Sequence, residues 1–551
     1  MTHSQPGQLF DVVIIGGGIA GLSVALRLPD DLRVALVTKG QLGESNTRYA
    51  QGGLAVAVGA DDSPALHFQD TIAAGAGLCD EDAVRILVEQ GPAAVHWLIK
   101  MGVQFDRARS GIDSHATPDG LLLGREGAHC RWRVLHAGGD ATGAEIERAL
   151  VAALRARTSI ALYEETFVDE LIMQEGRCIG VEAVDRSERA FTLNARAVVL
   201  ASGGAGGLWL HTSNPTGATA DGVALAWRAG AALADMEFMQ FHPTVLVANT
   251  SSHLLSEALR GEGAYLRNHK GERFMLRYSE QAELAARDVV ARAILREMLV
   301  EQTACQYLDL RHLPAAQMHK RFPNISAICQ QHGLDLTRDL LPIAPAAHYF
   351  MGGVMVDTYG RTTIPALYAV GEVSCTGVHG GNRLASNSLL EGLVYGLRVA
   401  DHLIEHRAES APAKYGLRNA TSFIAYDDGV QDEVCPSGNA DALTNTQARH
   451  ELRQLMWRYV SLFRDQEGLL TAKRRVRTLR GCVLASKEAK HDAAAGLRTR
   501  AETLAMLLAA ELVIVAALER RESRGSHWRL DYQATDKQLT GCHYALQRVP
   551  G

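Results

Sequence analysis

Short apolar runs near the amino terminus alternate with glycine-rich turns. Residues 9–15 (LFDVVII) are rich in β-branched side chains, four glycines follow within GGGIAGLSVALRL, and a second apolar run spans residues 32–37. This pattern predicts a strand, a tight turn, a helix and a second strand. Gly16 permits the turn, Gly18 lets the backbone approach a pyrophosphate, and Gly21 lets the helix pack on the strand. The spacing indicates a dinucleotide-binding unit, against the alternative of a glycine-rich turn without a ligand.

The adenosine end of such a unit departs from the usual pattern. An acidic residue normally follows about 20 residues later and holds a ribose hydroxyl. Thr38 and Lys39 stand at the end of the second predicted strand instead. We therefore expect Lys39 and backbone groups to bind the adenosine end of the dinucleotide.

Two later segments are predicted to extend the same sheet. Residues 197–204 (AVVLASGG) form an apolar strand that ends in small residues, and residues 364–372 (IPALYAVGE) form a strand that ends in Gly371 and Glu372. Ligands of open α/β sheets bind outside the carboxyl ends of the strands. A glycine and a carboxylate at this edge suit the ribityl chain of a flavin.

The carboxyl-terminal part of the chain has a different periodicity. Residues 446–463 and 501–520 carry apolar side chains at helical spacing, which predicts a compact helical bundle whose basic residues form a solvated face. Residues 421–445 are acidic and rich in helix breakers, which suits a domain boundary. Residues 530–551 have weak periodicity, and we expect them to be loosely ordered.

Composition narrows the class of protein. The 551 residues include 47% apolar and 21% charged residues, with a formal net charge of -6, so the chain is a folded protein of several domains without the basic surface that a nucleic-acid partner needs. Nine scattered cysteines show no metal-ligand spacing, so no metal is expected and reduced thiols fit best. The absence of a signal peptide pattern and of a long uninterrupted apolar run predicts a cytoplasmic protein with no membrane segment.

An insertion between the last two predicted strands carries arginines and histidines on short segments flanked by glycine or proline. Its motifs are MEFMQFHPT (236–244), SEALRGEGAYL (256–266), ARDVVARAI (286–294) and PAAHYFMGGV (345–354), and HGGNRLASNSLLEG (379–392) follows. Arg287, Arg383, His242 and His348 together can form a cationic pocket for a dicarboxylate. For any one buried histidine a structural role is the commoner alternative.

Together with AQGG (50–53), these motifs resemble the superfamily of fumarate reductases, succinate dehydrogenases and L-aspartate oxidases over about the first 420 residues. The resemblance implies an α/β fold with a Rossmann-like FAD-binding domain (1–235 and 351–420), an inserted α+β capping domain (236–350) and a C-terminal helical bundle (421–551). The insertion would close over the flavin as lids do. The residues implied to bind FAD are Gly16, Gly18, Ile19, Ala20, Gly21, Lys39, Ser45, Asn46, Thr47, Ala50, Gln51, Gly52, Gly53, Ala201, Gly203, Asp221, Glu372, Asn387, Ser388 and Leu389.

The same resemblance implies roles for the residues that face the substrate. Arg287 would lie over the reacting carbon as the proton-transfer group, and Glu257 would help it, because an arginine is a poor base in water. The alternative for Arg287 is a carboxylate clamp without acid–base chemistry. The residues implied to hold the substrate carboxylates are His242, Ser256, His348 and Arg383.

Two positions distinguish members of the superfamily. Asn46 stands where the membrane-complex flavoproteins carry the histidine that bonds to the flavin, and an amide cannot form that bond, so FAD should be noncovalent. REGAHCRWR (125–133) resembles the segment of L-aspartate oxidases whose glutamate faces the substrate's amino group, and Glu126 occupies that position. A carboxylate there would pair with the ammonium of aspartate. The alternative is an exposed loop in which Arg125 and Glu126 solvate each other.

The likeness to L-aspartate oxidases implies FAD-dependent oxidation of L-aspartate to iminoaspartate, with oxygen or fumarate as electron acceptor. It places the reaction first in de novo NAD biosynthesis, where quinolinate synthase uses the product. Two alternatives remain at this point: a soluble fumarate reductase or succinate dehydrogenase-type flavoprotein, and a flavin-binding scaffold without turnover.

Overall fold

The computed structural model describes residues 9–108, 115–248, 251–406, 421–429, 444–486 and 496–549. Strand β1 (Leu9–Ile15) pairs in parallel with β2 (Val34–Val37) on one side and with β9 (Ala190–Leu200) on the other. Helix α1 (Ile19–Arg27) connects β1 to β2. The predicted order of strand, turn, helix and strand is confirmed.

The main sheet has seven strands and separates two apolar cores. Its order is β6 (Ile160–Tyr163), β2, β1, β9, β8 (Arg177–Val184) and β7 (Phe167–Gln174), and β17 (Leu367–Ala369) also pairs with β9. Side chains alternate along β1: Val12 and Ile14 lie in the core that α1 and α10 (Asn387–Glu405) share, while Val13 and Ile15 lie in the core with α5 (Asp221–Arg228). A strand buried on both faces explains the continuous apolar run in the sequence.

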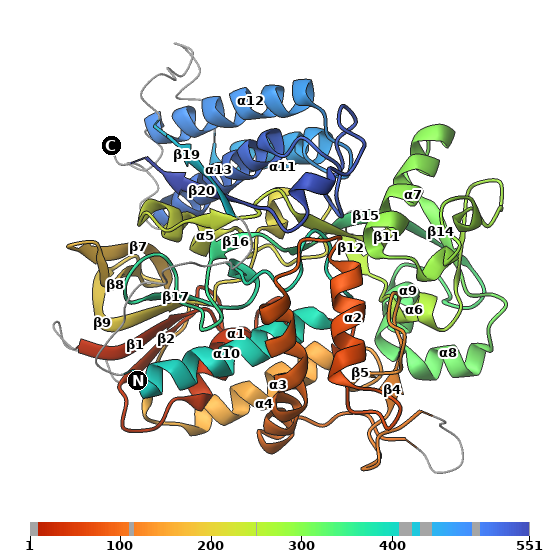
Figure 1. The fold of residues 1–551 in the computed structure, drawn as a ribbon, viewed down its shortest axis with the longest axis horizontal. Coiled ribbons are helices and arrows are strands. Elements are labelled where there is room, and N and C mark those ends of the chain that lie inside the picture. Colours follow the sequence, from red (N-terminus) through yellow and green to blue (C-terminus); the bar gives the residue numbers. More distant parts are fainter. Residues whose placement is uncertain are drawn as a thin grey trace.

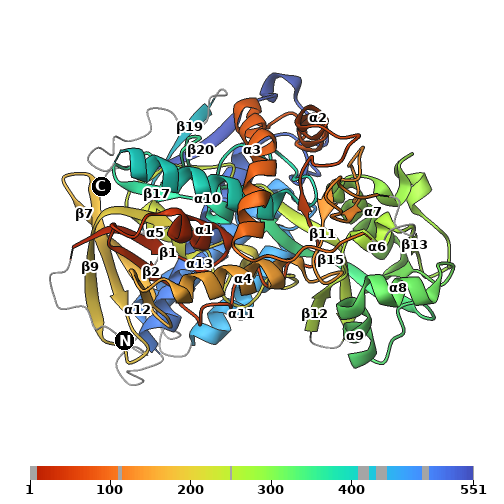
Figure 2. The same cartoon turned by 90° about the horizontal axis from the view of Figure 1, so that it is seen from below.

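Three helices and a small sheet complete this part of the chain. Helices α2 (Pro64–Ala74), α3 (Glu81–Lys100) and α4 (Thr142–Ala156) lie beside α1 and α10 (Figures 1 and 2). Strand β5 (Val134–Leu135) pairs with both β3 (Leu54–Ala55) and β4 (Leu123–Gly124). The AQGG segment precedes β3 and the REGAHCRWR segment connects β4 to β5, so this sheet brings the two motifs together.

A separate five-stranded sheet carries the insertion (green in Figure 1). Its order is β12 (Ser251–Leu254), β11 (Met239–Ala248), β15 (Leu340–Phe350), β14 (Gln306–Asp309) and β13 (Tyr265–Arg267). Helices α6 (Ala258–Gly261), α7 (Arg287–Glu301), α8 (Ala315–Arg321) and α9 (Pro323–Gln331) accompany it. Strands β11 and β15 pair antiparallel, with His242 opposite Ala346 and an irregular register on both sides of that pair. The two histidine motifs therefore lie on neighbouring strands.

Helices α11 (Asn445–Tyr459), α12 (Gln466–Ala485) and α13 (Gly496–Glu519) pack over the core that contains α5 (blue in Figure 1). The predicted C-terminal helical bundle is confirmed. Residues 497–519 are long and apolar enough to cross a membrane, with a mean hydropathy of 2.0, but 78% of an 18-residue window within them is buried inside the protein. Helix α13 is therefore a core helix of the folded chain.

The expectation of a loosely ordered tail is wrong for the described residues 530–549. Strand β20 (His543–Arg548) pairs with β10 (Leu233–Ala234) and β19 (Thr421–Tyr426), in a sheet completed by β16 (Gly353–Met355) and β18 (Ser374–Cys375). Its partners are distant in sequence, so no local pattern marks it. The expectation of reduced thiols fails at Cys482, which is disulfide-bonded, whereas seven other cysteines are free.

Candidate functional site

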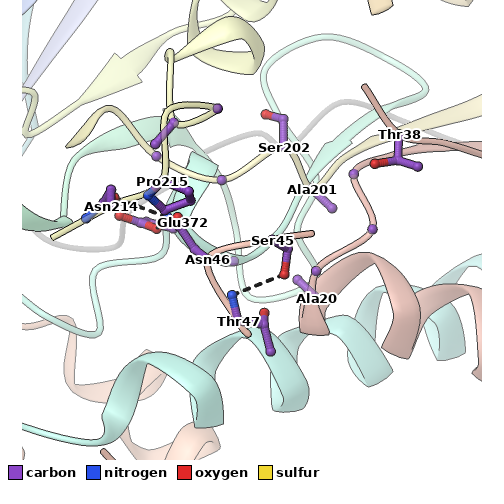
Figure 3. Close-up of a pocket in the computed structure, with 18 of the residues that line it drawn as sticks. Ala20, Thr38, Ser45, Asn46, Thr47, Ala201, Ser202, Asn214, Pro215 and Glu372 are labelled. Atoms are coloured by element: carbon purple, nitrogen blue, oxygen red, sulfur yellow. Dashed lines mark hydrogen bonds between the residues drawn. The ribbon is translucent and has the colours of Figure 1, made fainter. Parts of the chain in front are cut away.

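A cavity of about 490 Å³ lies at the carboxyl ends of β1, β2, β9 and β17 (Figure 3). Segments far apart in the sequence line it, as the strand pattern predicts. The predicted cofactor residues that line it are Gly16, Gly18, Ile19, Ala20, Lys39, Ser45, Asn46, Thr47, Ala50, Ala201, Gly203, Asp221, Glu372, Ser388 and Leu389. The other predicted cofactor residues, which are not among the lining residues, are Gly21, Gln51, Gly52, Gly53 and Asn387.

The glycine turn brings the backbone close to the cavity. Gly16 has a φ of +120°, and a Cβ there would lie 2.1 Å from the carbonyl oxygen of Ala201. A Cβ at Gly21 would lie 2.0 Å from the Gly16 carbonyl oxygen, so Gly21 allows α1 to pack on the turn. Thr47 Oγ1 accepts a hydrogen bond from the backbone N–H of Ile19 at the start of α1 (3.0 Å). The first turn of this helix faces the cavity, which suits a phosphate group.

Lys39 lies at the adenosine end with its ammonium already paired. Its Nζ donates to Thr219 Oγ1 (2.6 Å) and Asp221 Oδ2 (2.5 Å), and Glu502 Oε1 lies 3.6 Å away. Lys39 thus lines the cavity as expected, and Thr219 and Asp221 hold its ammonium group in place there. Glu502 and the lining residue Arg498 belong to α13, and no local sequence signal connects that distant helix to the cavity.

The flavin end is organised around Asn46 and Glu372. Asn46 Nδ2 donates to Glu372 Oε2 and to Asn214 Oδ1, both at 3.1 Å (Figure 3). Glu372 Oε1 accepts from the Phe350 backbone N–H (2.9 Å), and burial raises the pKa of Glu372 to about 7. Asn46 Oδ1 is buried and has no hydrogen-bond partner within the described ranges. The cavity thus combines a pyrophosphate cradle with a free acceptor at its far end, and these features fit FAD.

The predicted residues outside the lining support its walls. Asn387 donates from Nδ2 to Thr71 Oγ1 (3.1 Å), and its Oδ1 lies 2.9 Å from His67 Nε2. The backbone N–H of Gly53 donates to Ser386 Oγ (3.2 Å). Gln51 Oε1 is buried and, in the part of the chain that the structure describes, unpaired.

Glu126 is buried, with 2% of its surface exposed, so the exposed-loop alternative is wrong. Its Oε2 accepts a hydrogen bond from Ser386 Oγ (2.6 Å), and its Oε1 has no partner among the described residues. Burial and the nearby Glu257 raise the pKa of Glu126, while Arg287 and Arg383 oppose that rise. These cations come from distant motifs. The arginines of its own segment point elsewhere: Arg133 pairs with Asp62 and Asp70, and Arg125 is exposed.

Glu257 is the second buried carboxylate and is paired on both oxygens. Its Oε2 bonds to Arg287 Nε and its Oε1 lies 3.0 Å from Arg260 Nη2. These two guanidinium groups overcome the burial of the carboxyl group and lower its pKa. Arg287 is the first residue of α7, and its Nη1 donates to Gln240 Oε1 (3.1 Å). The guanidinium group of Arg287 is therefore held in place by two side chains, Glu257 and Gln240.

His242 and His348 lie with their rings 4.9 Å apart. Burial, together with Arg287, holds the pKa of each well below the ordinary histidine value. Burial and the nearby arginines both disfavour a positive charge on either ring. His242 Nδ1 accepts from the Thr244 backbone N–H (3.3 Å), so the ring proton sits on Nε2 and is available to a ligand. His348 Nδ1 lies 2.8 Å from Ser213 Oγ.

Arg383 contributes the remaining positive charge. Its guanidinium lies over the ring of Tyr349 at 4.6 Å, and its Nε has no partner within the residues described. Burial lowers its pKa to about 9, so it stays charged at neutral pH. Ser256, beside Glu257 in the chain, accepts at Oγ from the Ala258 N–H (3.3 Å). His348 lines the cavity, and the charges of Glu126, Glu257, Arg287 and Arg383 act on one another beside it.

Sequence reasoning missed four residues of this cluster. Gln240 fixes Arg287 and also donates to the Arg383 carbonyl (2.8 Å). Gln240, Arg260 and Ser386 lie inside the motifs at 236–244, 256–266 and 379–392, and their position in those motifs is the signal that could identify them. Tyr349, next to His348, is the fourth. No cluster of described side chains could hold a metal ion.

A dinucleotide cavity at the strand ends, beside buried arginines and a free carboxylate oxygen, defines a flavin-dependent oxidoreductase for a small charged substrate. An FAD binding domain family matches residues 11–389, and the fumarate reductase flavoprotein C-terminal family matches residues 449–548. The L-aspartate oxidase of Streptomyces coelicolor is 44% identical and covers 98% of this chain and 92% of that protein. The L-aspartate oxidase of Pseudomonas aeruginosa is 43% identical and covers 95% of each. The chain belongs to the L-aspartate oxidase family, and its cofactor is FAD.

Solved structures of fumarate reductases have the same fold as this chain. A quinol fumarate reductase from E. coli superposes with a TM-score of 0.85 at 29% identity, covering 97% of this chain and 93% of that one. Another quinol fumarate reductase gives a TM-score of 0.84 at 30% identity, covering 96% and 94%. The predicted α/β fold with an FAD-binding domain is confirmed.

Proposed function

We propose that this chain oxidises L-aspartate to iminoaspartate, with oxygen or fumarate as electron acceptor, as the first step of NAD biosynthesis. The observation that carries the proposal is the free, buried Oε1 of Glu126 among arginines. A plain dicarboxylate such as succinate gives this oxygen no partner, whereas the ammonium group of aspartate does. The relatives of similar length carry the same name.

One arginine and three hydrogen-bonding side chains hold the two substrate carboxylates. Arg383 retains an unpaired Nε, and His242 retains an Nε2–H donor. Charge-assisted bonds from such groups fix both the position and the orientation of a carboxylate. Ser256 and His348 complete the set of residues that we assign to carboxylate binding.

Glu126 binds the amino group of the substrate. Its raised pKa reflects a buried carboxylate beside a second carboxylate, Glu257. A bound ammonium supplies the missing opposite charge and stabilises the ionised form. The substrate is thereby oriented with its amino-bearing carbon toward the cavity that His348 lines. Holding the reacting carbon in one geometry contributes directly to the rate.

Oxidation of the substrate removes one hydrogen with an electron pair from the amino-bearing carbon and a second hydrogen as a proton. Arg287, with Glu257 as its partner, is the group that we assign to transfer of that proton. The carboxylate accepts from Arg287 Nε, and Gln240 accepts from Nη1, so the guanidinium group is held rigidly. FAD, when bound, accepts the two electrons that leave the substrate. It would be held noncovalently by the residues that line the cavity, because Asn46 offers an amide rather than an imidazole.

The domain division and the cellular context belong to the same proposal. Residues 1–235 and 351–420 bind FAD, residues 236–350 cap the substrate, and residues 421–551 form the C-terminal domain. The protein works in the cytoplasm on small molecules. Its imine product is unstable, so quinolinate synthase would use it soon after release.

The test begins with the purified oxidised protein. Acid precipitation should release free FAD, and anaerobic mixing with L-aspartate should bleach the flavin absorbance whereas succinate should not. Bleaching by succinate alone would assign the chain to the fumarate reductase side and leave Glu126 a structural carboxylate. No bleaching by any dicarboxylate would favour a scaffold without turnover.

Substitution of Glu126 sharpens the test. Glu126→Gln should reduce kcat/KM for L-aspartate by roughly 30-fold or more, the loss expected for a charge-assisted hydrogen bond, while fumarate reduction is largely retained. Glu297→Gln is the matched control. Glu297 lies further along α7 and is also buried, but it pairs with Arg277. Equal loss of both activities in Glu126→Gln would refute the amino-group role.

A further inference from the structure

One hydroxyl group joins the AQGG segment to the carboxylate of Glu126. The backbone N–H of Gly53 donates to Ser386 Oγ (3.2 Å), and Ser386 Oγ lies 2.6 Å from Glu126 Oε2. Ser386 is 5% exposed and immediately precedes α10. It therefore touches a flavin-side loop and the amino-group carboxylate at the same time.

The direction of both hydrogen bonds is fixed by their chemistry. A backbone N–H can only donate, so the Ser386 oxygen must accept from Gly53. The single hydroxyl proton is then free to point at Glu126 Oε2, which must accept it. The carboxylate consequently has one oxygen committed to Ser386, and the other, Oε1, is buried without a partner in the described part of the chain.

The backbone around Ser386 is held from both sides. Its φ is +60°, a left-handed conformation that is uncommon for a residue with a side chain. The Ala55 N–H donates to the Ser386 carbonyl oxygen (3.0 Å), and His129 Nε2 lies 3.0 Å from the carbonyl oxygen of Ala385. Surroundings that maintain such a conformation commonly serve a functional site.

Space is kept beside the free oxygen of Glu126. A Cβ on Gly52 would lie 3.4 Å from Glu126 Oε1 and 3.6 Å from Ser386 Oγ. The glycine therefore leaves this corner open, although residues of four segments surround it. A small cation such as an ammonium group needs that opening.

We propose that Ser386 is a specificity-positioning residue, whose hydroxyl anchors one oxygen of Glu126 so that the other meets the substrate's ammonium group. The inference rests on the proposed function and deepens it. Without the hydroxyl, the carboxylate is free to turn toward Arg287 or Arg383, both of which attract it. Recognition of the amino group would then weaken, while binding of a plain dicarboxylate would not.

The experiment measures aspartate oxidation and fumarate reduction, the latter with a reduced viologen dye, in the wild type and in two variants. Ser386→Ala removes the hydroxyl, and Ser386→Gly removes it while relieving the left-handed backbone, which protects the test against a folding defect. Both should lower kcat/KM for L-aspartate by roughly 10- to 100-fold with fumarate reduction within about twofold, as for a lost hydrogen bond to a charged group. Ser326→Ala is the control, because the hydroxyl of this buried α9 residue lies 3.1 Å from His319 of α8 and belongs to neither the cavity lining nor the charged cluster.

A double-mutant cycle distinguishes positioning from a general structural effect. In the Glu126→Gln background, Ser386→Ala should cost little more, because both changes remove the same interaction. Equal loss of aspartate and fumarate activity, unchanged aspartate activity, or full additivity with Glu126→Gln would each overturn the inference. A wild type that reduces fumarate but never oxidises L-aspartate would instead refute the proposed function itself.

Discussion

Substitution of Glu257 by glutamine should damage both stability and every activity, unlike substitution of Glu126. Glu257 is the counterion of two buried arginines, Arg287 and Arg260. Glutamine keeps one oxygen acceptor but loses the charge, so one guanidinium group stays without a carboxylate partner. Arg287 is also the proposed proton-transfer group, and its orientation depends on this contact.

The magnitude follows from burial. Removing one partner of a buried ion pair costs about 3–5 kcal/mol, and the remaining amide acceptor favours the lower end, about 3 kcal/mol. The folded-state pKa of Glu257 is lowered, so its contribution to stability is present above the unfolded-state value and is lost as the pH falls through the folded-state value. The difference between variant and wild type should therefore shrink in acid.

The assay is urea unfolding at pH 7 and at pH 4, alongside kcat for L-aspartate and for fumarate. Asp309→Asn provides the comparison, because Asp309 also pairs with two arginines but these are 28% and 46% exposed. Its loss should cost only about 1 kcal/mol. If Glu257→Gln destabilised the protein no more than Asp309→Asn, or retained fumarate reduction, the reasoning about Glu257 would be wrong.

Further predictions concern pH and the cofactor. The pKa of Glu126 is raised chiefly by burial. As the pH is lowered, kcat/KM for L-aspartate should therefore begin to fall at a higher pH than the protonation of an ordinary glutamate would produce. The pH profile of fumarate reduction should not show this acidic fall. Gly16→Ala should lose FAD, seen as a collapse of the ratio of absorbance at 450 nm to that at 280 nm by roughly tenfold, because its Cβ would collide with Ala201. Gly176→Ala, at a φ of +75° with nothing within 4 Å, should keep its FAD despite the same kind of backbone strain.

The cofactor side of the fold could be predicted largely from the sequence, because its signals are local. A β-branched run, a glycine spacing and a helix within residues 9–27 specify β1, the turn and α1 without any distant contact. Contacts between segments that are distant in sequence could not be predicted. Lys39 lines the cavity as expected, but its pairing with Asp221 and Glu502 has no signal near residue 39.

The sequence predicts which residues lie on the substrate side of the site, but not the charge states of those residues. The motifs correctly brought His242, His348, Arg287 and Arg383 into one region. Their charge states depend on burial and on mutual repulsion, neither of which can be derived from spacing. Burial and the nearby arginines lower the pKa of both histidines.

The C-terminal part acts on the site through the strand that carries His242. Arg520 of the segment after α13 bonds to Glu237, and Arg464 Nη1 donates to the Glu237 carbonyl oxygen (2.7 Å). Nearby, His543 of β20 lies 2.6 Å from Asp235. Asp235 and Glu237 lie just before β11, the strand that contains Gln240 and His242. The buried ion pairs thus fix the segment that leads from β10 to β11, the strand that enters the five-stranded sheet of the insertion. Since a partly broken buried pair costs several kcal/mol, the tail constrains the position of the substrate-binding strand as well as closing the fold.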